Sequence, residues 1–559
     1  MGKQSVERRV VAGSIKPWRH TEGITVKMLP LSRLAAAALL GLGCCANAQT
    51  REPVESLCRT AETCLAESGK LLGRPAGGGT SELARTQDMF YWFGRINMAS
   101  TVANVERGII APELAGPIAR GVAHSINQGA MPGGKRPNDV LQTEKIITDF
   151  AGPDATLIHT GRSRQDMHPT LTMGQLRVEL LDYTDRLAEL RAQLLEMAGQ
   201  NVETFVPAYT NGVQAMPTSY GQYLLAFADS FARDAERIRQ AWARVDRSPL
   251  GSAVLANSSW SLDRNRLADL LGFEALAING YDGTQISPND VGVEVAQIAG
   301  STALRVGSLM QDIHVQYHQT RPWLLLVPGK TYTSSAMPQK ANPGVIQDTR
   351  ALASDVVASV QNVVLRAHNV TPGMIDYKYS WTDARARTFV LGSQMLRDAT
   401  DVMASLRVDS KRSLEELESD WTTSMELAET LQRENRIPFR VGHHFASEVV
   451  LYAREHGLRP KDFPYTEAVR IYAEAGKMYQ LLDSRLPLDE ATFRRTLSPE
   501  SMVRTRVGIG GPQPAEVRRM LGEAQKTLAA DRQWVSERRQ HLAKAEARLN
   551  VAFSELLRR

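Results

Sequence analysis

A surplus of charge of one sign is absent from this chain once its first 48 residues are set aside. Those residues hold seven Lys or Arg against two Glu, a surplus of five that equals the formal net charge of +5. The other residues share 59 basic side chains (66 less seven) and 59 acidic ones (61 less two). Proteins that bind nucleic acid gather basic groups on one face, so this balance argues against a nucleic-acid partner.

Long apolar runs are also missing. The run at residues 34–43 is too short to cross a bilayer, which needs about 20 residues. It follows Arg33, and Ala46-Asn47-Ala48 supplies the small-x-small pattern of a cleavage site before Gln49. We therefore expect a leader and signal peptide over residues 1–48, with Met28 as the better initiator, and a periplasmic or secreted protein with no stable membrane insertion. The alternatives are a buried alanine-rich helix here and, if the leader is misread, a cytoplasmic protein.

Cysteine is scarce, and its position agrees with export. All four cysteines lie before residue 65, and cleavage after Ala48 leaves only Cys58 and Cys64. This pair fits either one local disulfide in an oxidising compartment or two free thiols. Nothing nearby supplies two further ligands, so zinc is disfavoured.

Alternating strand patterns and internal repeats are absent, whereas helical periodicity is present in three long stretches. Apolar residues recur three and four apart over 224–245, 291–313 and 352–363. The composition, 43% hydrophobic and 23% charged, is that of an ordinary globular protein. We predict an all-α protein.

Proline and glycine clusters divide the chain. They fall at 73–79, 131–137, 328–343 and 458–464. We expect an N-terminal arm and linker at 49–80, an N-terminal helical domain at 81–160, a central helical bundle at 161–408 and a C-terminal helical domain at 409–559.

The most informative segment is residues 333–343, Thr-Ser-Ser-Ala-Met-Pro-Gln-Lys-Ala-Asn-Pro, which we call the signature loop. Its two prolines stiffen a helix-free segment that carries hydroxyls, one cation and one amide at set offsets. Such a loop suits an anionic substrate, although polar loops of this composition are common. The run resembles Gly-Ser-Ser-x-Met-Pro-x-Lys-x-Asn-Pro of the fumarase/aspartase superfamily, with Thr333 in place of the glycine.

Further segments resemble one branch of that superfamily, the argininosuccinate lyase family. Residues 157–166, Leu-Ile-His-Thr-Gly-Arg-Ser-Arg-Gln-Asp, are similar to its His-Thr-Gly-Arg-Ser-Arg-Asn-Asp run, and residues 209–217, Tyr-Thr-Asn-Gly-Val-Gln-Ala-Met-Pro, to its Tyr-Thr-His motif. The similarity continues in the family's order through 247–252, 268–273 and 436–443. The resemblance implies a three-domain fold with a central long-helix bundle, and a homotetramer with shared active sites.

The resemblance also implies a reaction, β-elimination of an amine from an N-substituted aspartate to release fumarate, with no metal or organic cofactor. The partner would be a small dicarboxylate or amino-acid substrate. Ser334 would be the catalytic base, and Lys340 the cation that stabilises the carboxylate whose charge grows. The remaining site residues would bind substrate: Ser163, Arg164, Gln165, Thr210, Asn211, Ser335, Asn342 and Gln347.

Two departures from the family concern proton transfer. Asn211 replaces the family's histidine, and Gln347 replaces its glutamate, so a charged pair becomes two amides that can still hydrogen bond to each other. The identity of the general acid is therefore open.

His314 and His318 lie four residues apart on a predicted helix, a spacing that can bind metal. Without a carboxylate nearby, we favour a plain helical role for both.

The substrate is open too. The family's arginine-side motif, Tyr-Asn-x-Asp-Leu-Gln-Glu-Asp-Lys, has no counterpart at 369–378. We expect a lyase acting on an argininosuccinate-like or aminopolycarboxylate substrate. The alternatives are a genuine argininosuccinate lyase of arginine biosynthesis and a catalytically silent relative that only binds ligand.

Overall fold

The computed structural model describes residues 87–559, apart from the side chains of residues 375–383. The predicted leader, the arm and linker, and Cys58 and Cys64 lie outside the described residues. Among the described helices, none combines the length and the apolar character that a bilayer crossing requires.

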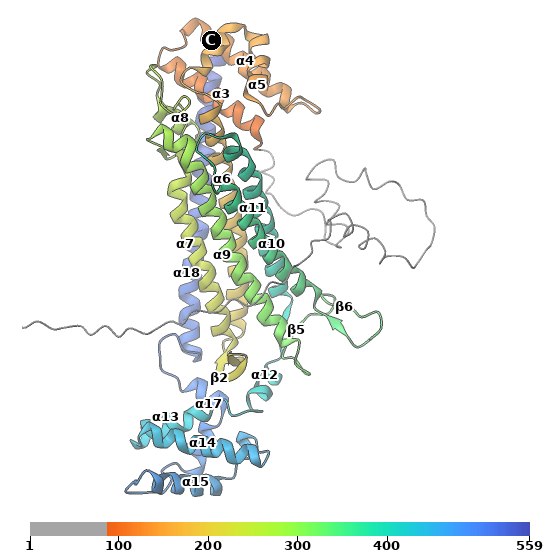
Figure 1. The fold of residues 1–559 in the computed structure, drawn as a ribbon, viewed down its shortest axis with the longest axis vertical. Coiled ribbons are helices and arrows are strands. Elements are labelled where there is room, and N and C mark those ends of the chain that lie inside the picture. Colours follow the sequence, from red (N-terminus) through yellow and green to blue (C-terminus); the bar gives the residue numbers. More distant parts are fainter. Residues whose placement is uncertain (1–86) are drawn as a thin grey trace, which may run out of the picture. The chain divides into compact units, whose positions relative to one another are not determined.

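Long helices lying side by side form the main body (Figure 1). They are α6 (Arg164–Gln200), α7 (Tyr220–Val245), α9 (Ser287–Gln316), α10 (Gly344–Ala367), α11 (Ile375–Ala404) and α18 (Pro514–Leu557). Helix α9 packs against α10, α11 and α7, and α6 packs against α7, α11 and α18. The predicted all-α class is confirmed.

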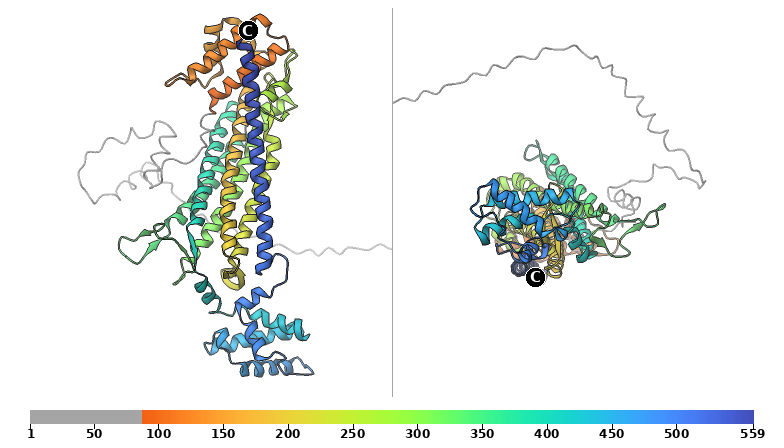
Figure 2. Two further views of the ribbon diagram at one scale, coloured as in Figure 1. Left: turned by 180° about the vertical axis from the view of Figure 1, so that it is seen from behind. Right: turned by 90° about the horizontal axis from the view of Figure 1, so that it is seen from below.

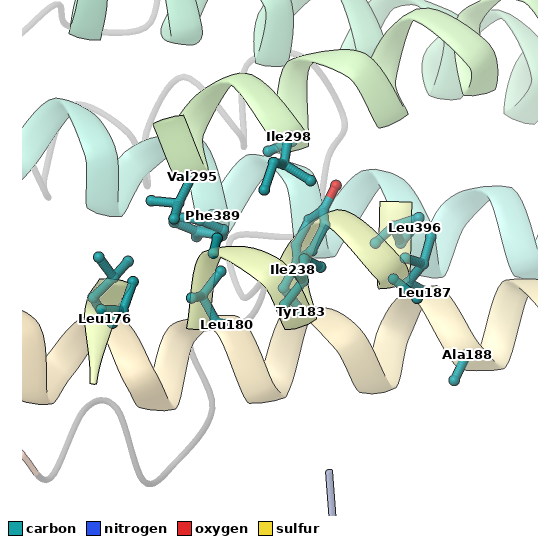
Figure 3. Packing of buried hydrophobic residues seen from close by; sticks show 14 of the residues in the cluster. Leu176, Leu180, Tyr183, Leu187, Ala188, Ile238, Val295, Ile298, Phe389 and Leu396 are labelled. Carbon is teal, nitrogen blue, oxygen red and sulfur yellow. The ribbon is translucent and has the colours of Figure 1, made fainter. Parts of the chain in front are cut away.

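The bundle forms because the predicted apolar stripes face one another. On α9, every member of the predicted stripe from Val291 to Ile313 is buried, and so are Leu352, Val356, Val360 and Val363 of α10. Figure 3 shows Leu180, Tyr183 and Leu187 of α6 meeting side chains from α7, α9 and α11. Each buried aliphatic or aromatic side chain contributes about 1.5–3 kcal/mol, so this seam is the main source of the fold's stability.

A smaller group of helices packs on the same core. These are α3 (Met89–Glu106), α4 (Pro112–Ala130), α5 (Val140–Ala151), the 3₁₀ helix η3 (Pro153–His159) and α8 (Arg264–Leu270). The parallel pair β3 (Arg247–Ser248) and β4 (Ala275–Leu276) lies beside α8. A π-helical turn, η4 (Asp282–Ile286), leads into α9.

A second hydrophobic core lies within residues 421–497 and centres on Phe445, Phe463, Tyr472 and Phe493. The helices that carry it are α13 (Ser424–Asn435), α14 (Phe439–Glu455), α15 (Tyr465–Met478) and α16 (Glu490–Thr496), with η5 (Pro460–Asp462) between α14 and α15. Helices α12 (Ser410–Leu417) and α17 (Pro499–Arg504) pack instead on Phe205, through Leu417 and Val503.

The last helix, α18, does not share that core. Its apolar residues Val517, Leu528, Leu549 and Phe553 belong to the core of the main bundle. A buried ion pair joins Asp531 to Arg191 of α6, and the end of α18 packs on α4 (Figure 2). The predicted domain boundaries at residues 160 and 408 stay predictions. Helix α18, which we expected to end the C-terminal domain, packs on the bundle instead, because its apolar face contacts α6 and α7.

In the part of the chain that the structure describes, three short antiparallel strand pairs lie between these helices. Two of them are hairpins, β1 (Phe205–Thr210) with β2 (Val213–Ser219) and β6 (Tyr332–Thr333) with β7 (Ala341–Asn342). The third joins β5 (Leu324–Leu326) to β8 (Leu406–Val408), with α10 and α11 between them in the sequence. The two hairpins carry predicted site residues.

Candidate active site

The signature loop is the connection of the β6–β7 hairpin. The Ser334 amide donates to the Lys340 carbonyl at 3.3 Å, and the Asn342 side chain donates to the Tyr332 carbonyl at 3.3 Å. These bonds close the loop and hold Ser334 and Lys340 at its neck. Most of the loop, including Ser335 and Lys340, is exposed to solvent.

The hydroxyl of Ser334 accepts two hydrogen bonds from its own loop. The backbone amides of Ala336 and Met337 donate to Oγ at 3.3 and 3.1 Å. Hydrogen bonds to the charged form of a group favour that form, so these two amides stabilise a Ser334 alkoxide relative to the hydroxyl. The arrangement provides part of what a serine needs to act as a base.

Ser163, Arg164 and Gln165 form the first turn of α6. Ser163 is the N-cap: its hydroxyl accepts from the Gln165 amide at 3.0 Å and donates to the Ala253 carbonyl at 3.1 Å. Arg164 is half-exposed and pairs with Asp139 at 3.0 Å. The positive end of a helix dipole and an adjacent guanidinium attract carboxylates, as the predicted role requires.

Two buried residues hold this turn in place, and sequence reasoning did not single them out. Arg162, only 7% exposed, donates to Asn97 Oδ1 at 2.6 Å and to Ser100 Oγ at 2.7 Å. Asp166 accepts from the backbone amides of Ser163 and Gly251 at 2.7 and 2.9 Å. Burial raises the pKa of Asp166 to about 7, against the opposing effect of these bonds.

Thr210 and Asn211 lie at the tip of the β1–β2 hairpin. Thr210 pairs with Val213, so Asn211-Gly212 is a two-residue turn with φ values of +52° and +76°. Both values are left-handed, as in a type I′ turn, and asparagine and glycine are the residues that adopt it most easily. The geometry therefore gives Asn211 a backbone role beside any role in the site.

Gln347 lies in the first turn of α10, directly after the signature loop. Its side-chain nitrogen is 3.4 Å from Nε2 of His314, in the last turn of α9. No hydrogen bond joins Gln347 to Asn211 in the described part of the single chain. The predicted contact between the two amides stays a prediction.

Within one chain the predicted residues fall into two groups. Helix α10 begins beside the end of α9, and Gln319, just beyond α9, donates to Tyr209 of the β1–β2 hairpin at 3.4 Å. The signature loop, Gln347 and Thr210 are therefore at the end of the bundle where α6 finishes. Ser163, Arg164 and Gln165 are where α6 begins, 37 residues earlier. At 1.5 Å per residue the helix separates the two groups by about 55 Å.

A cavity in the described part of the chain coincides with neither group. It has a volume of about 240 Å³ and is lined by Tyr91, Trp92 and Arg95 of α3 with residues of α6, α8 and α18. None of the predicted site residues lines it. This cavity is therefore not a place where the predicted site residues meet.

Known proteins match both the sequence and the fold. Residues 135–358 match the model of the Lyase family, and residues 421–504 match that of the argininosuccinate lyase C-terminal family. The argininosuccinate lyase of Methanoculleus marisnigri is 30% identical over 510 residues, 88% of this chain and 97% of the relative. Argininosuccinate lyase 1 of Shouchella clausii is 28% identical, covering 83% of this chain and 93% of the relative.

The fold is likewise similar to solved structures. EDDS lyase in complex with formate superposes with a TM-score of 0.75 at 24% identity, covering 89% of this chain and 96% of that one. Class II fumarase of Schistosoma mansoni gives 0.57 at 14% identity, covering 76% and 93%.

These findings define the class first: the protein has the helical-bundle fold of the fumarase/aspartase superfamily and is a carbon–nitrogen lyase. Within that class, the chain belongs to the argininosuccinate lyase family.

Proposed function

We propose that the protein releases fumarate from an N-substituted aspartate by β-elimination, with Ser334 as base. The observation that carries the proposal is the pair of loop amides donating to Ser334 Oγ. A serine hydroxyl is too weak a base unless its alkoxide is stabilised, and this loop supplies that stabilisation.

In the proposed reaction, Ser334 removes a proton from the carbon beside one carboxylate. The negative charge that develops on this carboxylate is stabilised by Lys340 and Asn342, which lie at the neck of the same loop. The carbon–nitrogen bond then breaks, its electron pair goes to nitrogen, and fumarate remains. The N-terminus of α6 with Arg164 would hold the substrate carboxylates through charge-assisted hydrogen bonds.

The proposed site is shared among copies in a homotetramer. Support comes from the separation of about 55 Å between the two groups along α6, which one chain cannot close. Support also comes from apolar side chains that are exposed on the bundle: Leu304 of α9 is 62% exposed, Val315 44%, and Leu365 of α10 72%. A second copy packed on these helices would bury them and cover the exposed signature loop.

The proposed substrate carries an amine other than that of argininosuccinate. Asn211 and Gln347 stand where the family has a charged pair, and residues 369–378 lack the family's arginine-side motif. The relatives are named for argininosuccinate, which makes that substrate the first to be compared.

The direct test is a screen of N-substituted aspartates, argininosuccinate included, for fumarate release measured by ultraviolet absorbance. The reverse direction, fumarate with a library of amines, covers leaving groups outside the panel. We expect release from at least one N-substituted aspartate that exceeds release from argininosuccinate.

A second candidate function is a silent relative that binds such ligands without cleaving them. The loss of the imidazole and the carboxylate together favours it, because neither asparagine nor glutamine exchanges protons near neutral pH. Binding without fumarate release, measured by calorimetry on the same panel, would support this candidate and refute the lyase.

We also propose that the protein is exported and acts in the periplasm or outside the cell. Support comes from the Arg33 flank, the apolar run and the Ala46-Asn47-Ala48 pattern. Protein isolated from its host should begin at Gln49. An intact leader on soluble cytoplasmic protein would refute export.

A further inference from the structure

The proposed reaction lacks a group that can protonate the departing nitrogen. An alkylamine leaves poorly as an anion, so a proton must reach nitrogen as the carbon–nitrogen bond breaks. The family residues for this region are replaced by Asn211 and Gln347, neither of which can donate a proton as an acid.

The structure brings an imidazole to this place from another helix. His314 lies in the last turn of α9, and its Nε2 is 3.4 Å from the side-chain nitrogen of Gln347. Gln347 directly follows the signature loop, and its backbone amide bonds to the Pro343 carbonyl at 3.3 Å. His314 is half-buried, whereas its neighbour His318, one turn later on α9, is exposed.

Two neighbouring groups that can carry charge, Arg350 and His318, act on His314. Arg350 of α10 is held by Gln311 at 2.8 Å, one turn before His314. The His318 ring meets the His314 ring edge-to-face at 5.7 Å between centroids. Burial, then Arg350, then His318 lower the pKa of His314. A lower pKa makes the imidazolium a stronger acid, and a bound dianionic substrate would restore the protonated form by offsetting Arg350.

We infer that His314 is the general acid of the elimination and delivers its proton to the leaving amine. The inference rests on the proposed function. Ser334 takes the proton from carbon, the electron pair of the carbon–nitrogen bond goes to nitrogen, and the imidazolium gives nitrogen its proton and becomes neutral. Between turnovers Ser334 releases a proton to water and His314 takes one up, so protons balance. Gln347 then orients the imidazolium when its amide turns Oε1 toward the ring and accepts from Nε2–H, which leaves the proton on Nδ1 for the leaving nitrogen.

The test compares His314→Gln with His318→Gln as the matched control, on two substrates. N-alkylaspartates have a strongly basic leaving amine, whereas N-phenylaspartate releases an arylamine that needs much less protonation. We expect His314→Gln to lower kcat for the alkyl substrate by about 10²–10⁴-fold and for the aryl substrate by far less, since general acids contribute roughly that range. The wild-type pH–rate profile should have a basic limb, on which activity falls as pH rises, and His314→Gln should lack this limb.

His318→Gln should leave kcat for both substrates within about twofold of the wild-type value. It should move that limb to higher pH, because His318 helps to lower the pKa of His314. Equal losses on both substrates in His314→Gln, or an unchanged pH profile, would overturn the inference while the proposed function survives. A wild-type protein that releases no fumarate from either substrate or from the wider panel overturns the proposed function first, and His314 then has no reaction to serve.

Discussion

Replacing Ser334 with alanine should separate catalysis from stability, because the hydroxyl contacts only its own exposed loop. The substitution removes two hydrogen bonds, from the Ala336 and Met337 amides. A net hydrogen bond is worth about 0.5–1.5 kcal/mol, and these amides can turn to water instead, so the lower end applies. In a chain of this size about 1 kcal/mol shifts Tm by less than about 2 °C.

The catalytic loss should be far larger. Removing a general base costs about 10²–10⁴-fold, which corresponds to about 3–5 kcal/mol of transition-state stabilisation. Activity should therefore fall by at least two orders of magnitude while Tm and oligomer size are unchanged. The assay is fumarate release on the best substrate of the panel, with Tm and size-exclusion mass measured on the same preparations.

The matched control is Ser354→Ala on α10. Its hydroxyl is also exposed and bonds only to the Arg350 carbonyl at 3.4 Å, so activity and Tm should both stay unchanged. Retention of more than about a tenth of the rate in Ser334→Ala would exclude Ser334 as the base. A Tm drop of many degrees would instead show that the loop has a structural role that the contacts do not reveal.

Three further predictions follow from the contacts around α6. Inactive Ser334→Ala and Arg164→Ala chains should regain part of the wild-type activity when co-expressed, because a shared site can draw its two groups from different copies; no recovery in verified mixed oligomers would count against sharing. Arg162→Lys should lower Tm by several degrees and raise KM, since lysine cannot keep both buried bonds to Asn97 and Ser100 and the adjoining turn of α6 loses its support. Burial raises the pKa of Asp166 from 3.8 to about 7. The stability that its protonated form contributes is therefore complete below about pH 4 and is lost as pH rises through 7. In Asp166→Asn this pH-dependent part of the Tm should vanish, and a Tm–pH curve equal to that of the wild type would refute the raised pKa.

The long helices of the bundle could be predicted from sequence because the spacing of apolar residues that indicates a helix lies within each segment. The stripes on α7, α9 and α10 recur every three or four residues, and burial on one face follows directly from that period. The docking of α18 could not be predicted in the same way. Helix α18 has 44 residues, and periodicity does not say which surface an apolar helix face will meet.

The candidate site also combines residues that the sequence could indicate with a contact that it could not. Motif resemblance predicts Ser334, Arg164 and Thr210 as site residues, and these stay predictions. The Asn211-Gly212 pair is typical of a two-residue hairpin turn, which explains the left-handed backbone there. The contact between His314 and Gln347 joins residues 33 apart on two helices, and no local pattern records it. Such a contact emerges only from the way α9 and α10 pack.

The late return of α18 has a consequence for how the chain is made. Asp531 closes a buried ion pair with Arg191, its partner 340 residues earlier. At about 5–20 residues per second, a ribosome adds Asp531 to the chain roughly 20–70 s after Arg191. Until then the surfaces of α6 and α7 that α18 covers are exposed, and the central core is incomplete. Folding of the central core therefore cannot finish until α18 has left the ribosome, long after the other helices of the bundle have been made.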